Sequence, residues 1–206
     1  MSSRTLGAAI AGGASRRYGS PKPFALVGQR MLIERVLDAL RDASDEQAII
    51  ANDAAAFSRF NVPVRADVIA DAGALGGIHA ALVHARERGC SGAVVLACDM
   101  PFPSGPLLRA LARRGIDDGA DAVLPESDGP RGVEPLCAYY ATSCAASIED
   151  ALARGDRRVI GFLDDVRYVR YATADVARFG EPARLFMNVN TPEERARAER
   201  IAASGT

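Results

Sequence analysis

Short apolar runs and segments of helical periodicity alternate along the first half of the chain. The runs that predict strands cover residues 5–10, 48–51, 62–69 (a weaker case) and 92–98. Apolar side chains three and four positions apart predict helices over 30–42, around 78–85 and around 107–111. Strands that alternate with helices in this way favour parallel pairing, because each helix carries the chain back across the sheet.

The second half carries fewer signals. Residues 121–125 and 133–140 are predicted to be strands, with the polar loop 126–132 between them. No linker, repeat or low-complexity segment divides the chain, and 206 residues suit one α/β domain. We therefore expect a three-layer, Rossmann-like α/β fold with a mostly parallel central sheet, formed by residues 1–206 as a single domain.

Composition narrows the classes of partner. The chain has 25 basic and 26 acidic residues and a net charge of −1, so we expect no nucleic-acid and no membrane partner. Its four cysteines form no C-x-x-C pair and show no zinc spacing. No signal peptide precedes the first strand, and no apolar run approaches the length of a membrane span. These features predict a reduced, cytoplasmic protein.

A glycine-rich, cationic loop follows the first predicted strand. Gly12 and Gly13 can adopt positive φ and let a ligand approach the backbone, and Arg16 and Lys22 add positive charge. Lys22 is the only lysine in this arginine-rich chain, and its ammonium group would bind phosphate as a point charge. The spacing matches neither the P-loop nor the dinucleotide fingerprint. A phosphate-binding loop is favoured over an ordinary surface turn.

Polar residues also follow the later predicted strands. Asn52, Asp71 and Asp99 each come directly after an apolar run, and the carboxyl ends of parallel strands meet at one edge of a sheet. We expect these residues to share a site with the glycine loop. Asp99 could be a ligand of Mg²⁺, which binds through one or two carboxylates, or a turn residue before the helix that Ser104 introduces.

Five segments resemble the molybdenum cofactor guanylyltransferase (MobA) family of nucleotidyltransferases. Residues 6–22 resemble its opening Leu-Ala-Gly-Gly-x-Ser-x-Arg-Met-Gly-x-x-Lys signature, with Ile10, Tyr18 and Pro21 as departures. The other segments are Cys98–Phe102, Glu134–Tyr140, the Arg-Arg-Val of 157–159, and Asn188–Glu194 with its Asn-x-Asn-Thr-Pro-Glu motif. In the last of these, Thr191 and Glu194 also predict a capping box before a helix.

The resemblance implies a nucleotidyltransferase fold whose N-terminal half binds the nucleotide and whose C-terminal half binds the acceptor substrate. It implies transfer of GMP from GTP to molybdopterin or its molybdenum-bound form, with release of pyrophosphate and with Mg²⁺ held by Asp99. The residues implied as catalytic are Lys22, Asp99 and Arg17. Those implied in nucleotide binding are Ala11, Gly12, Gly13, Arg16, Gly19, Lys22, Asn52, Asp71, Gly77 and Asp99. Those implied to face the acceptor substrate are Arg157, Asn188 and Asn190, although by its sequence alone residue 157 would be a solvated start to a short helix.

Three alternatives remain at this point. The protein could use CTP, or transfer to a sugar phosphate, or bind a nucleotide without turnover. The Ala11-Gly12-Gly13 run and the Asn-x-Asn motif resemble the guanylyl branch better than its sisters, whereas Pro21 in place of the usual acidic residue keeps the non-catalytic alternative open. We further expect a monomer or weak homo-oligomer, with transient contact to molybdoenzyme maturation proteins.

Overall fold

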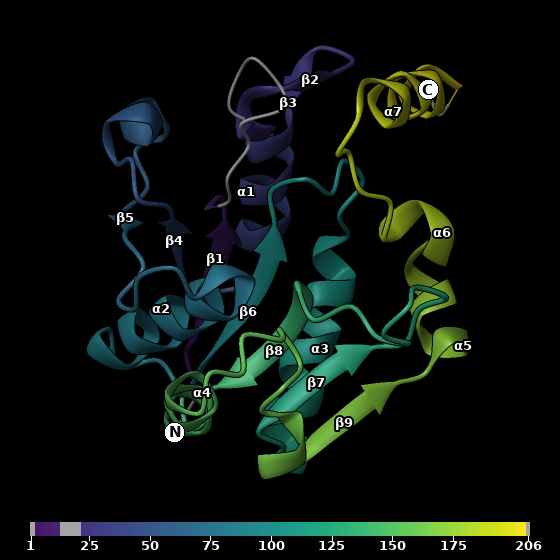
Figure 1. Ribbon diagram of the computed structural model, residues 1–206. Helices are drawn as coiled ribbons and strands as arrows, with labels where there is room; N and C mark the ends of the chain where they lie inside the picture. Colours follow the sequence, from purple (N-terminus) through teal and green to yellow (C-terminus); the bar gives the residue numbers. More distant parts are fainter. Residues whose placement is uncertain (1–2, 13–21, 205–206) are drawn as a thin grey trace.

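The computed structural model describes residues 3–12 and 22–204. Its main sheet has seven strands in the order β5-β4-β1-β6-β8-β7-β9 (Figure 1). These strands are β1 (Thr5–Ile10), β4 (Glu46–Ile50), β5 (Val64–Arg65), β6 (Gly92–Ala97), β7 (Ala122–Pro125), β8 (Cys137–Ala141) and β9 (Tyr168–Tyr171). A separate hairpin pairs β2 (Leu26–Val27) with β3 (Arg30–Met31).

Helices connect the strands and flank the sheet. The α-helices are α1 (Leu32–Ala43), α2 (Gly73–Glu87), α3 (Gly105–Asp118), α4 (Cys144–Ala153), α5 (Thr173–Val176), α6 (Pro182–Leu185) and α7 (Pro192–Ser204). Short 3-10 helices are η1 (Lys22–Phe24), η2 (Ala55–Phe60), η3 (Leu163–Asp165) and η4 (Ala177–Phe179). Among the described residues, no helix combines the length and the apolar character needed to cross a bilayer.

The predicted α/β fold with a mostly parallel sheet is confirmed. β1 pairs in parallel with β4 on one side and with β6 on the other, and β4–β5 and β7–β9 are also parallel. Within the main sheet of the described residues, β8 alone runs antiparallel to its neighbours, β6 and β7. The parallel strands β1, β4 and β6 therefore direct their carboxyl ends to the same edge of the sheet, at the top of Figure 1.

Two predicted strands are shorter in the structure, and each begins within two residues of a proline. Of the region 62–69 only Val64–Arg65 pairs with the sheet, directly after Pro63. Of the region 133–140 only the part from Cys137 onward is strand, after Pro135, and Val133 forms an isolated bridge with Glu126. Because proline lacks an N–H group, it interrupts the ladder of backbone hydrogen bonds.

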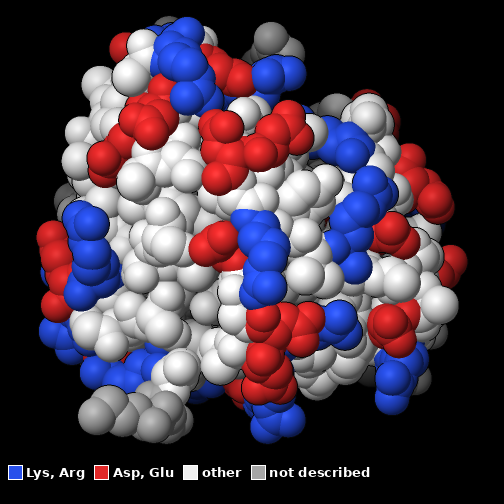
Figure 2. All heavy atoms as spheres, turned by 90° about the horizontal axis from the view of Figure 1, so that it is seen from below, with Lys and Arg blue, Asp and Glu red and all other residues white. Residues whose placement is uncertain are grey.

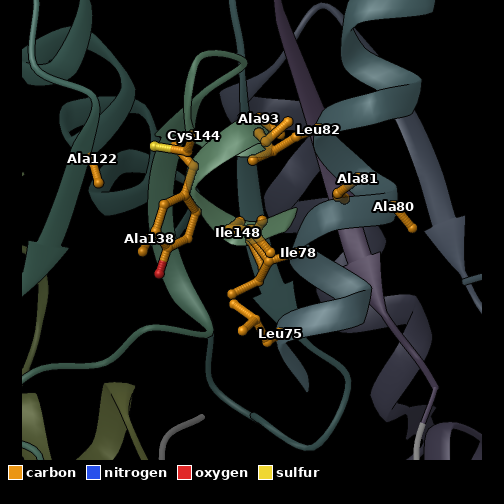
Figure 3. Close-up of a cluster of buried hydrophobic side chains, with 14 of the residues drawn as sticks. Leu75, Ile78, Ala80, Ala81, Leu82, Ala93, Ala122, Ala138, Cys144 and Ile148 are labelled. Carbon is orange, nitrogen blue, oxygen red and sulfur yellow. The ribbon is translucent and has the colours of Figure 1, made fainter. Parts of the chain in front are cut away.

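Alternation along β1 divides the core between the two faces of the sheet. Leu6, Ala8 and Ile10 pack into a cluster with apolar residues of α2 and α4, which Figure 3 shows from Leu75 on α2 to Ile148 on α4. The intervening Ala9 belongs to a second cluster, built from α1 and α3. Successive side chains of a strand point to opposite faces, so the two helical pairs form the outer layers of a three-layer fold (Figure 1).

Charge is spread over the end of the molecule that lies opposite the carboxyl ends of β1 and β6. Seen from below in Figure 2, basic and acidic side chains are interspersed, with uncharged surface between them. A mixed surface of this kind produces no extended field of one sign.

Tyr139 of β8 fits against two glycines. A Cβ atom added at Gly115 of α3 would lie 2.3 Å from the Tyr139 ring carbons Cδ1 and Cε1, and one added at Gly92 of β6 would lie 2.6 Å from Tyr139 Oη. Both distances are far below van der Waals contact, so the missing side chains let α3 and β6 approach this buried ring.

We predict that Gly115→Ala destabilises the protein, although glycine-to-alanine changes in helices normally stabilise by about 1 kcal/mol. Overpacking against Tyr139 is expected to produce a net loss of about 1–3 kcal/mol in the free energy of unfolding. Urea denaturation measures this loss, with Arg113→Ala on an exposed turn of α3 as the control. A Gly115→Ala protein as stable as the wild type would contradict the predicted clash.

Candidate active site

The carboxyl ends of the three central parallel strands are joined by backbone hydrogen bonds. Ala11 N–H donates to Ile50 O at 3.0 Å, and Cys98 N–H donates to Ile10 O at 3.0 Å. The pairing thus continues past the last residues of β1 and β6, and it places Ala11 and Asp99 in loops that leave one edge of the sheet.

Lys22, Asp99 and Asn190 converge at this edge. Lys22 Nζ lies 3.3 Å from Asp99 Oδ2 and also donates a hydrogen bond to Asn190 Oδ1. The Lys22 and Asp99 side chains are 22% and 25% exposed, so the ion pair is shielded but open to a ligand. The three residues come from η1, from the loop after β6 and from the segment before α7.

Backbone and helix-capping contacts hold the C-terminal segment in this position. Val189 N–H donates to Asp99 O at 2.8 Å, which fixes the asparagines on either side of it near the aspartate. The predicted capping box is confirmed, because Glu194 accepts from the Thr191 N–H and donates its own N–H to Thr191 Oγ1 at 3.1 Å. Arg195 Nε further donates to Leu26 O in β2 at 3.0 Å, and a small apolar cluster packs α7 on this hairpin.

A cavity of about 620 Å³ opens beside Asp99. Its lining includes the predicted residues Asp99, Arg157, Asn188 and Asn190. The other lining residues are Ala74, Ala97, Met100, Arg131, Glu134, Pro135, Leu136, Arg158, Val159 and Ile160. The cavity therefore combines basic side chains with an apolar wall, as a site for an anionic molecule with a ring system would.

One carboxyl group that lines the cavity, and one that is adjacent in sequence to a lining arginine, have shifted pKa values. Burial raises the pKa of the Glu134 carboxyl and the nearby charge of Asp99 raises it further, against the effects of a hydrogen bond from Ser127 and of Arg131. Hydrogen bonds from the Arg158 side chain and backbone lower the pKa of Asp156 to about 2. Asp156 thereby holds the neighbouring Arg158 at the cavity.

Arg157 and Arg158 are exposed and lie in an irregular segment, which continues as a turn over residues 159–162. The short helix that its sequence suggested begins only at Leu163, as η3. Val159 and Phe162 are buried and anchor the turn, while Arg157 and Arg158 line the cavity. The segment is thus solvated and also part of the candidate site.

The remaining nucleotide candidates that the structure describes do not line this cavity. Asn52 forms two hydrogen bonds with Asp67, from its Nδ2 to Asp67 Oδ2 at 3.1 Å and from the Asp67 N–H to its Oδ1 at 2.9 Å. A Cβ atom at Gly12 would lie 3.9 Å from the same carboxylate, so Gly12, Asn52 and Asp67 form one group. Asp71 is exposed and has φ of 55°, a left-handed conformation two residues before α2.

Gly77 has a packing position in α2. It is buried, and a Cβ atom there would lie 3.2 Å from Ile10 Cγ2, so its lack of a side chain permits close contact between α2 and the end of β1. Gly13, Arg16, Arg17 and Gly19 lie outside the described residues.

The chemistry at Asp99 suits Mg²⁺. Among residues 3–12 and 22–204, no group of three or more His, Cys, Asp or Glu side chains could enclose a metal ion. Mg²⁺ needs no such enclosure, because it is commonly held by one or two carboxylates together with substrate phosphates and water. Asp99 offers one partly exposed carboxylate at the cavity, with the cationic Lys22 beside it for phosphate oxygens.

Sequence reasoning missed three residues that the structure brings to the site region. Asp67 lies in the weak strand region, where no local pattern distinguished it from a loop aspartate. Arg131 lies in the polar loop between β7 and β8. Glu134 lies in a segment for which the sequence offered a resemblance to a family motif but no role for this residue. The sequence feature that could have identified these three residues is their position near β5 and β8, because the ends of these strands border the site.

A family model and a full-length relative agree on one family. Residues 7–168 match the MobA-like NTP transferase domain. The chain is 35% identical over 201 residues to the molybdenum cofactor guanylyltransferase of Desulfosudis oleivorans, covering 97% of this chain and 96% of that protein.

Solved structures agree with this match. The structure is similar to molybdopterin-guanine dinucleotide biosynthesis protein A from Archaeoglobus fulgidus, with a TM-score of 0.83 and 32% identity over 97% of this chain and 99% of that one. A Mycobacterium tuberculosis protein crystallised in complex with manganese shares the fold, with a TM-score of 0.61 and 18% identity over 96% and 99% of the two chains.

We predict that the thiols of the native protein react slowly with Ellman's reagent at pH 8. All four cysteines are buried and free, and burial raises the pKa of Cys137 and of Cys144 to about 12 and that of Cys98 and Cys90 above the usual range. Little reactive thiolate is therefore present. Denatured protein should titrate four thiols per chain, and rapid labelling without denaturant would contradict the buried placement.

Proposed function

The chain belongs to the MobA-like NTP transferase family, and we propose that it transfers GMP from GTP to the terminal phosphate of molybdopterin, with or without bound molybdenum. The observation that carries the proposal is the convergence of Lys22, Asp99 and Asn190 beside a cavity with basic and apolar walls. This arrangement can hold a triphosphate on one side of Asp99 and a phosphorylated ring system on the other.

The proposed reaction needs positioning and charge neutralisation more than proton transfer. A phosphate oxygen of the acceptor substrate forms a bond to the α-phosphorus of GTP, the bond from that phosphorus to the β-phosphate bridging oxygen breaks, and pyrophosphate leaves. Because the attacking phosphate is already anionic, no general base is required. The protein accelerates such a step by aligning the two substrates and by opposing their mutual repulsion.

The proposed nucleotide half of the site consists of the glycine loop and the residues at the ends of β1 and β4. Lys22 and Arg17, with Arg16, neutralise the triphosphate and the departing pyrophosphate. Backbone N–H groups of Gly12 and Gly13 and near Gly19 contact phosphate oxygens. The nucleoside is bordered by Asn52, Asp71 and Gly77.

Asp99 is the proposed ligand of Mg²⁺, which when bound would offset the charge that develops on the α-phosphate. Its carboxylate also orients Lys22 through their ion pair. Arg157, Asn188 and Asn190 are proposed to bind the acceptor substrate, since all three line the cavity. The whole chain would act as one cytoplasmic domain, as a monomer or weak homo-oligomer, with transient contacts to molybdoenzyme maturation proteins.

We predict that GTP with Mg²⁺ raises the melting temperature of the protein more than CTP, ATP or UTP does. A ligand that binds only the folded state stabilises it, by about 2.7 kcal/mol at a hundredfold excess over Kd. Differential scanning fluorimetry with each nucleotide measures the effect, and Mg²⁺ alone is the control. Stabilisation by CTP and not by GTP would instead favour a cytidylyltransferase.

We predict that Asp99→Asn lowers pyrophosphate release with GTP and molybdopterin at least about a hundredfold, because it removes the carboxylate charge that would hold the metal ion. Asp117→Asn is the matched control, since it makes the same substitution on the exposed surface of α3. Nucleotide binding without measurable pyrophosphate release in the wild type would support the non-catalytic alternative.

A further inference from the structure

Among the described residues that line the cavity, Glu134 carries the one carboxylate besides Asp99. Its backbone is anchored on both sides, because the Glu134 N–H donates to Pro125 O at 3.0 Å and its carbonyl accepts from the Cys137 N–H at 3.1 Å. Ser127 Oγ donates to Glu134 Oε1 at 2.8 Å. The carboxylate is therefore fixed in place before a ligand arrives, which lowers the entropic cost of binding.

The surroundings of Glu134 define what kind of ligand the cavity fits. Pro135, Leu136, Val159 and Ile160 supply an apolar wall, and three arginines supply positive charge. A matching ligand has a flat apolar ring and an anionic group. It also needs an edge of hydrogen-bond donors for Glu134, because an ionised carboxylate only accepts hydrogen bonds.

The position of Glu134 in the sheet assigns this ligand to the acceptor half of the site. Glu134 precedes β8, which lies on the side of β6 away from β1 and β4. The proposed nucleotide residues Gly12 and Asn52 follow β1 and β4, and neither lines the cavity.

We propose that Glu134 selects the acceptor substrate by accepting two hydrogen bonds from the donor edge of a 2-amino-4-oxopyrimidine ring. This edge consists of the exocyclic amino group and the adjacent ring N–H. It is part of a pterin, so the inference rests on the proposed function and deepens it. The guanine of GTP carries the same edge, and the experiment must separate the two sources.

Replacing the amino group of the ring by a carbonyl gives a sharp test. Lumazine, the 2-oxo counterpart of pterin, would place a carbonyl oxygen against the Glu134 carboxylate, where two hydrogen-bond acceptors repel. Glu134→Gln changes the protein in the complementary way, because an amide has one acceptor and one donor. The variant therefore matches the lumazine edge and mismatches the pterin edge.

The experiment measures the binding of pterin and of lumazine by equilibrium dialysis at neutral pH. The wild type is expected to prefer pterin by about tenfold or more, because lumazine leaves a charged acceptor without its partner. Glu134→Gln should lower this ratio by at least about tenfold and bring it to or below one. Asp128→Asn is the matched control, since it removes an exposed negative charge from the same loop and should keep the wild-type ratio.

A purely structural role of Glu134 would weaken both ligands equally or lower the melting temperature, and unchanged discrimination in Glu134→Gln overturns the proposal. A parallel arm compares GTP with its 2-oxo analogue, xanthosine triphosphate, by thermal shift in the presence of Mg²⁺. We expect the same GTP preference in the wild type and in Glu134→Gln. A loss of that preference in the variant would assign Glu134 to the nucleotide and overturn its assignment to the acceptor substrate.

The two proposals can fail separately. A wild-type protein that releases pyrophosphate with GTP and molybdopterin, yet shows no preference for pterin over lumazine, overturns the role of Glu134 alone. Pterin binding with the expected preference and its reversal in Glu134→Gln, but without pyrophosphate release, supports Glu134 and contradicts the transfer reaction.

Discussion

The pairing of β1 with parallel strands on both sides is the constraint on which the site depends. All six residues of β1 are buried, so their backbone groups need partners inside the protein; β4 and β6 supply these on either side, and Asp45 supplies them at Thr5. Parallel pairing brings the carboxyl ends of three strands to one edge, and the ladder continues through Ala11 and Cys98. Substrates that carry several negative charges then meet a rigid edge whose groups need little rearrangement.

The second requirement is the convergence of distant segments on Asp99. Lys22 is separated from it by 77 positions, and Lys22 and Asn190 are separated by 168. The capping box of α7 and the contact of Arg195 with β2 secure the C-terminal segment, so local helix chemistry supports a long-range contact. An ion pair that is only partly shielded contributes little stability by itself, which leaves Lys22 and Asp99 free to exchange partners with a charged substrate.

The sequence predicts the strands that have a local apolar pattern, but it does not predict the features that depend on how the strands pair. The apolar runs of β1 and β6 and the helical period of α1 were sufficient, because burial of such segments follows from their own pattern. The antiparallel position of β8 between β6 and β7 could not be predicted, since the sequence of a strand does not specify which strands pair with it. For the same reason Lys22 and Asp99 could be proposed as charges near strand ends, whereas Glu134 and Asp67 acquire their neighbours only through tertiary contacts.

The attachment of α7 to the β2–β3 hairpin also orders events during synthesis on the ribosome. Every strand of the main sheet precedes residue 172, so the nascent chain can build its central layers before Asn188 and Asn190 leave the exit tunnel. Until then Lys22 lacks its amide neighbour, and α7 is not yet available to cover the apolar surface of the hairpin at Val27. The C-terminal segment therefore docks on Lys22 and Asp99 after the strands have left the ribosome, and the complete site assembles last.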